Sequence, residues 1–156
     1  MDESARSRES GGDGDEKPHV LVVPYPAQGH MLPFLDLVAL LAARGLALTV
    51  AATPGNVPLL APLLASCPPS SVATVTLPFP SSSLSGLLPA GCGENTKDLP
   101  GHLFRPFMAS LAALREPLLA WCKAQRHRVT AVVSDMFTGW TQPLTAELGV
   151  PSLSVS

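Results

Sequence analysis

The sequence predicts an α/β protein in which helices cover both faces of a parallel sheet. Short apolar runs rich in β-branched residues, typical of strands buried on both faces, recur along the chain. Longer segments with helical character separate these runs, and this alternation indicates parallel strands joined by right-handed crossovers. The chain has 156 residues, a length that suits one domain with a buried core.

The first 18 residues differ in composition from the rest and predict a disordered, polar and acidic tail. They hold six acidic and three basic side chains among Ser and Gly, with too little apolar surface to bury. They also lack the apolar run of a signal peptide. We therefore expect a tail over residues 1–18 and a single folded domain over residues 19–156.

The first expected strand, residues 19–23, leads through a Pro-rich turn into an apolar helix over residues 31–43. Pro33 is tolerated best in a first helical turn, so the helix should begin near His30. Gly45 should end the helix. Two further runs are expected to form strands, residues 46–52 and 72–77.

The remaining elements follow the same alternation. Asn56 should cap a short helix that continues to about Ala65. The Pro-, Ser- and Gly-rich segment 78–100 is too long for a simple connector and is either functional or mobile. Helical periodicity over residues 103–121 contains Pro117, which should kink or split the helix. The last elements are a strand at 130–134, a helix at 138–148 that ends at Gly149, and a strand at 151–156.

Composition and motifs argue against several classes of function. No apolar run is long enough to span a membrane, and the densest basic patch, residues 123–128, is a solvated helix end that does not indicate a nucleic-acid partner. The three cysteines (Cys67, Cys92 and Cys122) form neither a disulfide framework nor a zinc site, which suits a reducing cytoplasm. The turn after the first strand lacks the glycine fingerprint of dinucleotide sites, and no phosphate-binding loop or serine elbow is present.

Sheet topology predicts that His30 and Asp135 meet. With the usual strand order 3-2-1-4-5, the first and fourth strands are neighbours, and ligands bind outside their carboxyl ends. His30 follows the first strand and Asp135 the fourth. Each has an ordinary alternative: His30 as a half-buried polar residue and Asp135 as a helix cap. Together they suit a general base and the carboxylate that orients it.

Four segments resemble plant UDP-dependent glycosyltransferases that act on small molecules. The run HVLVVPYPAQGHMLP at residues 19–33 is similar to the opening of these enzymes. Further similarity lies in LTVAATP at 48–54, REPL at 115–118, and VVSDMF at 132–137 with Gly139-Trp140 behind it. The resemblance covers nearly all of residues 18–156.

The resemblance implies a Rossmann-like domain: the incomplete, acceptor-binding N-terminal half of a GT-B fold. In this family the histidine corresponding to His30 deprotonates the acceptor hydroxyl, the aspartate corresponding to Asp135 relays charge, and the sugar is transferred with inversion. Gln28, Gly29, His30 and Phe137 are expected to bind the acceptor, a flavonoid or another phenolic. For Phe137, as for Trp140 and Phe107, core packing is the favoured alternative. No metal or cofactor is expected.

The resemblance also implies that a major part of such an enzyme is missing from this sequence. The family recognises its UDP-sugar, typically UDP-glucose, through a C-terminal box that no segment here matches. Two hypotheses follow. The chain is either a fragment of a UDP-glycosyltransferase, or an inactive truncated product that binds only an acceptor or other chains.

Overall fold

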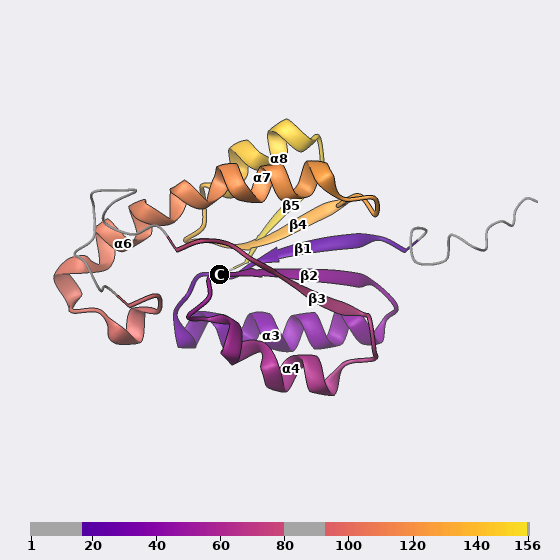
Figure 1. The fold of residues 1–156 in the computed structure, drawn as a ribbon, viewed down its shortest axis with the longest axis horizontal. Helices are drawn as coiled ribbons and strands as arrows, with labels where there is room; N and C mark the ends of the chain where they lie inside the picture. The colour runs from indigo at the N-terminus through magenta and orange to yellow at the C-terminus, as the bar shows by residue number, and fades with distance from the viewer. Residues whose placement is uncertain (1–16, 80–92, 156) are drawn as a thin grey trace, which may run out of the picture.

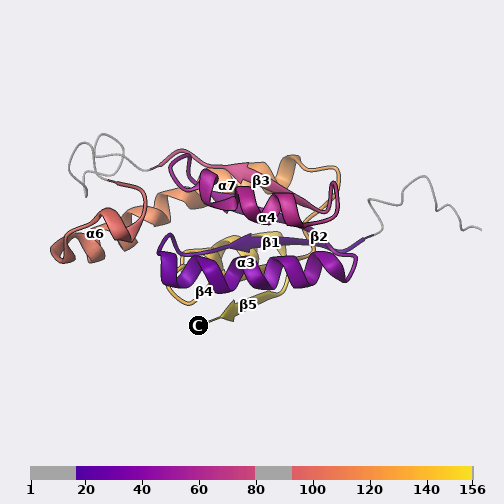
Figure 2. The same cartoon turned by 90° about the horizontal axis from the view of Figure 1, so that it is seen from below.

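Five parallel strands form one sheet in the computed structural model, which describes residues 17–79 and 93–155 (Figure 1). The order β3-β2-β1-β4-β5 confirms the prediction, with β3 and β5 at opposite edges (Figure 2). Val23 at the end of β1 pairs with Ser134 of β4. The predicted tail lies almost entirely outside the described residues, as does Cys92. The strands are β1 (His19–Val23), β2 (Ala47–Ala52), β3 (Val72–Thr76), β4 (Ala131–Asp135) and β5 (Ser152–Val155).

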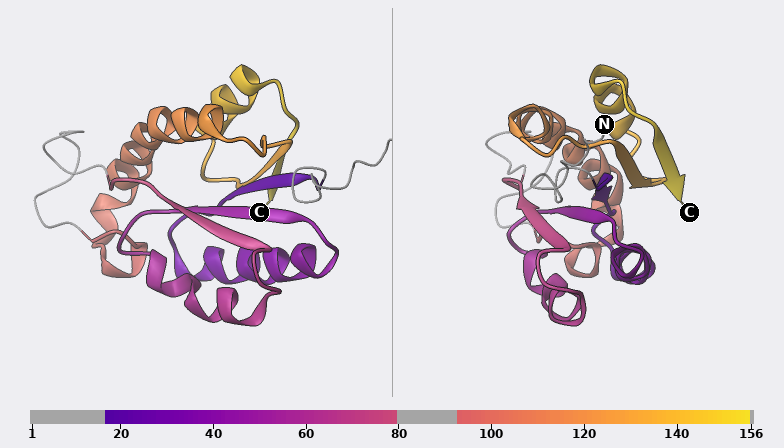
Figure 3. Two further views of the ribbon diagram at one scale, coloured as in Figure 1. Left: turned by 45° about the vertical axis from the view of Figure 1, so that its right-hand side comes forward. Right: turned by 90° about the vertical axis from the view of Figure 1, so that its right-hand side faces the viewer.

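Helices cover both faces of the sheet and give three layers, as Figure 3 shows in its right-hand view. The helices α3 (Gln28–Ala43) and α4 (Ala61–Ser66) lie on one face. The opposite face carries α7 (Arg115–Ala124) and α8 (Thr141–Leu148), while α6 (Phe104–Ser110) extends beyond the carboxyl ends of the strands (Figure 1). Short 3-10 turns complete the chain: η1 (Val57–Leu60), η2 (Thr96–Asp98), η3 (Gly101–Leu103) and η4 (Leu111–Leu114).

The core has two parts, one on each face of the sheet. All of β1 is buried, and its side chains alternate between the faces. Leu21 and Val23 pack in the cluster that includes Phe107 and Leu118. Val20 and Val22 belong to the cluster formed with α3. The central strand is thus apolar on both sides, as the uninterrupted run of residues 19–23 predicts.

Two prolines lie differently from the prediction. The helix α3 begins at Gln28, because the Ala27 carbonyl already accepts from the N–H groups of His30 and Met31. Pro33 therefore lies in the second turn and not in the first. Pro117 lies in the first turn of α7, where its missing N–H costs nothing. The predicted helical break occurs just before it, in η4.

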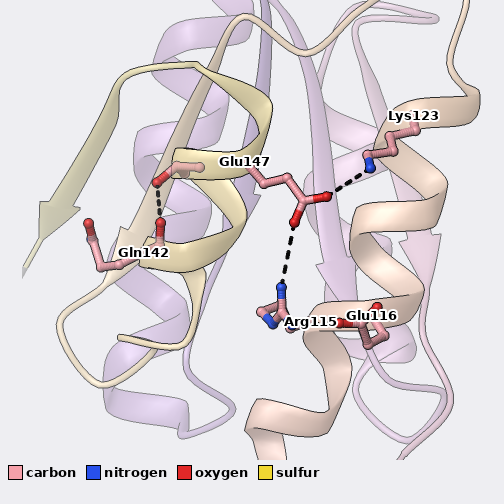
Figure 4. A network of polar contacts seen from close by, with 6 residues as sticks. Arg115, Glu116, Lys123, Gln142 and Glu147 are labelled. Carbon is pink, nitrogen blue, oxygen red and sulfur yellow. Dashed lines mark hydrogen bonds and ion pairs between the residues drawn. The ribbon is translucent and has the colours of Figure 1, made fainter.

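An ion-pair cluster joins α7 to α8 at the surface, as Figure 4 shows. The Glu147 carboxylate accepts a hydrogen bond from Lys123 over 2.8 Å and lies 4.0 Å from Arg115. The bond from Lys123 is the main reason that the pKa of Glu147 is lowered. Because Glu147 and Lys123 are exposed, their ion pair adds little stability to the contact between the two helices. Lys123, Arg126 and Arg128 are all exposed, which confirms the predicted solvated helix end.

A buried histidine closes the amino-terminal end of the sheet. Nδ1 of His19 lies 2.7 Å from the His127 carbonyl, and Nε2 lies 2.8 Å from Oγ1 of Thr49. A carbonyl is an acceptor only, so the proton resides on Nδ1 and Thr49 donates to Nε2. Burial lowers the pKa of His19 below 6.5, and the nearby His127 charge lowers it further, against the raising effect of the hydrogen bond to the His127 carbonyl.

Acidification is expected to destabilise the fold through His19. Because the folded-state pKa is lowered, the unfolded chain binds more protons at pH values between that pKa and 6.5. The free energy of unfolding should therefore fall as the pH drops below 6.5, and level off beneath the folded-state pKa. Urea unfolding at a series of pH values measures this fall. His19→Gln should reduce it and His102→Gln, at an exposed site, should not; an equal fall in all three proteins contradicts the assignment.

Candidate functional site

The structure brings His30 and Asp135 together where β1 and β4 end side by side. Nδ1 of His30 lies 2.7 Å from Oδ2 of Asp135. The histidine comes from the first turn of α3. The aspartate is the last residue of β4, whereas the sequence predicts that it follows the strand. The Asp135 side chain is 2% exposed and that of His30 is 31% exposed. The pair thus has a buried carboxylate and a histidine that ligands can reach.

The Asp135 carboxylate is held at both oxygens. Oδ1 accepts from the Phe137 N–H over 2.8 Å while Oδ2 faces His30. The Asp135 carbonyl in turn accepts from both the N–H and the hydroxyl of Thr138. The Asp135 side chain thus accepts from the backbone two residues ahead, as aspartates do in turns. No side chain caps α8. The helix-cap reading of Asp135 is therefore wrong.

This arrangement fixes the tautomer of His30. A carboxylate only accepts hydrogen bonds, so Nδ1 carries the proton and Nε2 keeps its lone pair. Nε2 has no hydrogen-bond partner within residues 17–79 and 93–155. His30 can therefore take a proton at Nε2, and Asp135 can stabilise the imidazolium that results.

Two aromatic rings flank His30. The Tyr25 ring centroid lies 5.4 Å from that of His30, and the Phe137 centroid lies 5.1 Å away. Tyr25 and Phe137 also meet edge to face, with centroids 5.4 Å apart. Tyr25 is buried, whereas Phe137 is 37% exposed. The imidazole thus packs against two aromatic rings, while 31% of the His30 side chain stays exposed.

The hydroxyl of Tyr25 reports on the charge of Asp135. Burial, and after it the negative charge of Asp135, raise the pKa of Tyr25 above 10.0. Tyr25 is the only tyrosine in the chain, so the absorbance of tyrosinate follows this residue alone. We expect a titration midpoint above 10.0, and a lower midpoint in Asp135→Asn while circular dichroism still reports a folded chain. The same midpoint in both proteins contradicts the electrostatic coupling.

A buried amide pair holds the turn that carries His30. Asn95 Nδ2 donates to Asn56 Oδ1 over 3.0 Å, and Asn56 Nδ2 donates to the Thr53 hydroxyl and the Glu94 carbonyl. The Thr96 N–H donates to the Pro26 carbonyl, so residues 93–98 are fastened to the β1–α3 turn. Asn56 stands at the N-cap position of η1, as the sequence predicts, but its side chain makes no capping hydrogen bond. Its side chain instead links the end of β2 to a segment 38 residues away.

A small cavity lies beside this turn, at the carboxyl ends of β1, β2 and β3. Its volume is about 30 Å³ and its lining is mainly apolar. Residues from the β1–α3 turn, the end of β2, η4 and the segment after β4 enclose it. They include Pro26, Met31, Thr53, Leu111, Thr138 and Trp140.

The other aromatic residues named in the sequence analysis differ in burial. Phe107 is fully buried in the core, which confirms core packing, and Phe137 is half-exposed beside the histidine. Trp140 is half-buried at the cavity. The predictions for Gln28 and Gly29 concern side-chain positions outside those the structure describes. The sequence did not predict the contacts of Thr138 or of the Asn56–Asn95 pair. The only signal for them was that polar residues follow the ends of the strands.

The comparisons with known proteins agree on one family. The family model described as the N-terminal domain of glycosyltransferases matches residues 16–149. UDP-glycosyltransferase 89A2 of Arabidopsis thaliana is 44% identical over 140 residues, which are 89% of this chain and 29% of that protein. UDP-glycosyltransferase 89B2 of Stevia rebaudiana is 46% identical over 85% of this chain and 27% of its own length. The chain belongs to the UDP-glycosyltransferase family.

Solved structures of the family share the fold. UGT89C1 of Arabidopsis thaliana, in complex with UDP-L-rhamnose, has a TM-score of 0.81 at 32% identity over 89% of this chain and 36% of that chain. The same enzyme complexed with quercetin also gives 0.81. The parallel sheet with its helices thus has the fold of the N-terminal part of a GT-B UDP-glycosyltransferase. The chain spans between a quarter and a third of the length of its curated relatives.

Two further observations concern the setting of this UDP-glycosyltransferase domain. Within the described ranges, no helix has the length and apolar content needed to cross a membrane. Cys67 and Cys122 are both free thiols, and burial raises the pKa of Cys122 to about 11. The Cys122 thiol therefore stays protonated near neutral pH and is a packing residue.

Proposed function

We propose that this chain is the acceptor-binding part of an enzyme that transfers a sugar from a UDP-sugar to a hydroxyl group of a small plant metabolite. The observation that carries the proposal is the His30–Asp135 pair, with its 2.7 Å contact, buried carboxylate and free Nε2. Glucose is the proposed sugar and a flavonoid or another phenolic the proposed acceptor. Support comes from a relative named flavonol 3-O-glucosyltransferase UGT89B1, of Arabidopsis thaliana, at 41% identity.

In the proposed reaction, His30 is the general base and Asp135 its charge-stabilising partner. Nε2 removes the proton of the acceptor hydroxyl as the oxygen attacks the anomeric carbon of the sugar. The bond between that carbon and the UDP oxygen breaks, UDP leaves with the electron pair, and the configuration at the carbon inverts. A side chain supplies the base, so the proposed mechanism calls for no metal or cofactor. The UDP-sugar is a co-substrate that a C-terminal domain would bind.

Phe137 is the proposed acceptor contact beside the base. Its ring is 37% exposed and lies 5.1 Å from the His30 ring, so a planar phenolic can pack on it while presenting a hydroxyl to Nε2. Gln28 and Gly29 remain proposed acceptor-binding residues because of their place in the first turn of α3. The cytoplasm is the proposed location, supported by the two free thiols.

Sugar transfer by a chimaera tests the proposal. Residues 17–155 replace the corresponding part of UGT89C1, and the purified protein is incubated with UDP-glucose or UDP-L-rhamnose and a panel of phenolic acceptors. Mass spectrometry should detect glycosides of one or more acceptors. A folded chimaera that transfers no sugar, while UGT89C1 itself does so under the same conditions, contradicts the proposal.

The second candidate is a chain that binds an acceptor or other chains and catalyses nothing. The unmodified 156-residue chain, incubated with UDP-glucose and the same acceptors, distinguishes the two. Glycoside formation by this chain rules the second candidate out, and acceptor binding without turnover supports it.

A further inference from the structure

The first turn of α3, which carries His30, is held in place by its neighbours. Ala27 at its N-cap position provides no side-chain hydrogen bond, so the position of the turn depends on contacts with other segments. On one flank lies β4, whose Asp135 carboxylate is 2.7 Å from Nδ1 of His30. Because β1 lies between β4 and β2 in the sheet, the other flank is the β2 side. Contacts on that side decide how firmly His30 is directed at Asp135.

Residues 94–97 hold the turn on the β2 side. The Thr96 N–H donates to the Pro26 carbonyl over 2.9 Å, and Nδ2 of Asn95 contacts the sulfur of Met31 over 3.8 Å. Pro26 precedes the histidine by four positions and Met31 follows it directly. The segment therefore contacts the chain on both sides of the proposed base.

The Asn95 side chain has only one orientation that satisfies its neighbours. The Glu94 carbonyl only accepts, so the Asn56 atom that lies 2.7 Å from it is Nδ2. Oδ1 of Asn56 then accepts from Nδ2 of Asn95 over 3.0 Å. Oδ1 of Asn95 accepts from the Lys97 N–H over 3.1 Å, which caps η2. Asn95 is 3% exposed and uses its amide oxygen as well as both amide hydrogens.

We propose that Asn95 is a positioning residue for the base. It fixes the turn on the β2 side so that Nδ1 of His30 faces the Asp135 carboxylate on the β4 side. This inference rests on the proposed function, and it adds that proton transfer depends on a buried amide that acts through Met31 and the backbone. Without that amide the turn can shift, and an imidazole that loses its carboxylate partner is no longer confined to the Nδ1–H tautomer.

Nuclear magnetic resonance of the imidazole nitrogens in the 156-residue chain tests the positioning. Asn95→Ser keeps an oxygen that can cap η2, but its shorter side chain donates to neither Asn56 nor Met31. In mildly alkaline solution the unaltered chain should show His30 as the Nδ1–H tautomer, and Asn95→Ser should show a mixture of both tautomers. The chain has four histidines, and the signal that is lost in His30→Ala belongs to His30.

Turnover by the chimaera with UGT89C1 supplies a second readout. Asn95→Ser should lower the turnover number by about tenfold to a hundredfold, since a catalytic group misplaced by about 1 Å loses activity on this order. Turnover should fall more than acceptor affinity. Thr145→Val is the matched control, because Thr145 is buried on α8 and donates one hydrogen bond, to the Gln142 carbonyl. This control should keep both the His30 tautomer and the turnover number.

The outcomes separate this inference from the proposed function. A folded chimaera that transfers no sugar overturns the proposed function, while the imidazole signals of the 156-residue chain still test the positioning. A folded Asn95→Ser protein with an unchanged tautomer or unchanged turnover overturns the positioning role alone, and so does an equal change in Thr145→Val. If Asn95→Ser does not fold, Asn95→Asp takes its place, because it keeps the shape and the capping oxygen and removes both donated hydrogen bonds.

Discussion

Replacing His30 by alanine is expected to lower the rate of sugar transfer by roughly a hundredfold to ten-thousandfold, the usual contribution of a general base. The change removes Nε2, the only free imidazole nitrogen of the pair, and leaves the sheet and its core untouched. The measurement is the turnover number of the chimaera with UGT89C1, with acceptor binding followed in parallel. Because the imidazole acts in the transition state, turnover should fall much more than acceptor affinity.

Two further variants test the partner of the base and provide a control. Asp135→Asn should cause a loss of similar order, because an amide can donate to Nδ1 and so favour the tautomer whose Nε2 carries a proton. His102→Ala changes an exposed histidine in η3 and should leave turnover unchanged. A chimaera that retains full turnover without His30 refutes the assignment of the base.

Replacing Phe107 by alanine is expected to destabilise the fold by about 3–5 kcal/mol, the usual cost of deleting a buried aromatic ring. Phe107 is fully buried, and its ring lies 6.2 Å from that of Tyr25 and 6.0 Å from that of Phe79. A domain of this size has a total free energy of unfolding of only about 5–15 kcal/mol. The variant should therefore unfold at a much lower urea concentration, or fail to fold at room temperature.

Phe104→Ala is the matched control on the same helix. Phe104 is 45% exposed, so its replacement should change the free energy of unfolding by less than about 0.5 kcal/mol. Equal losses in the two variants would contradict the division of α6 into a buried and an exposed side. A large loss in Phe107→Ala and not in Phe104→Ala shows that the buried side of α6 contributes strongly to stability.

The sequence was most informative where local pattern and sheet topology act together. The run of residues 19–23 predicted β1 to the residue, because an uninterrupted β-branched segment has few alternatives to a buried strand. Strand order then predicted that His30 and Asp135 meet, although 105 positions separate them. Topology carries such predictions because the carboxyl ends of parallel strands share one edge.

The remaining contacts depend on tertiary packing that no local pattern encodes. Asn56 is an acceptable helix cap in sequence terms, yet its side chain bonds to Glu94 and Asn95, near the end of an irregular segment. The break before α7 likewise falls in η4 rather than at Pro117, because a proline in a first helical turn loses no hydrogen bond. The cavity that Trp140 lines likewise forms only where segments distant in the sequence converge.

The pairing of Val23 with Ser134 has a consequence for how this domain can diversify. It places the ends of β1 and β4 next to each other, so the spacing between base and carboxylate is a property of the central sheet. The cavity beside this pair is lined partly by segments outside the sheet, such as η4 and Trp140. Under the proposed function, new acceptor preferences can thus arise by exchanging those outer segments while the contact between His30 and Asp135 is kept.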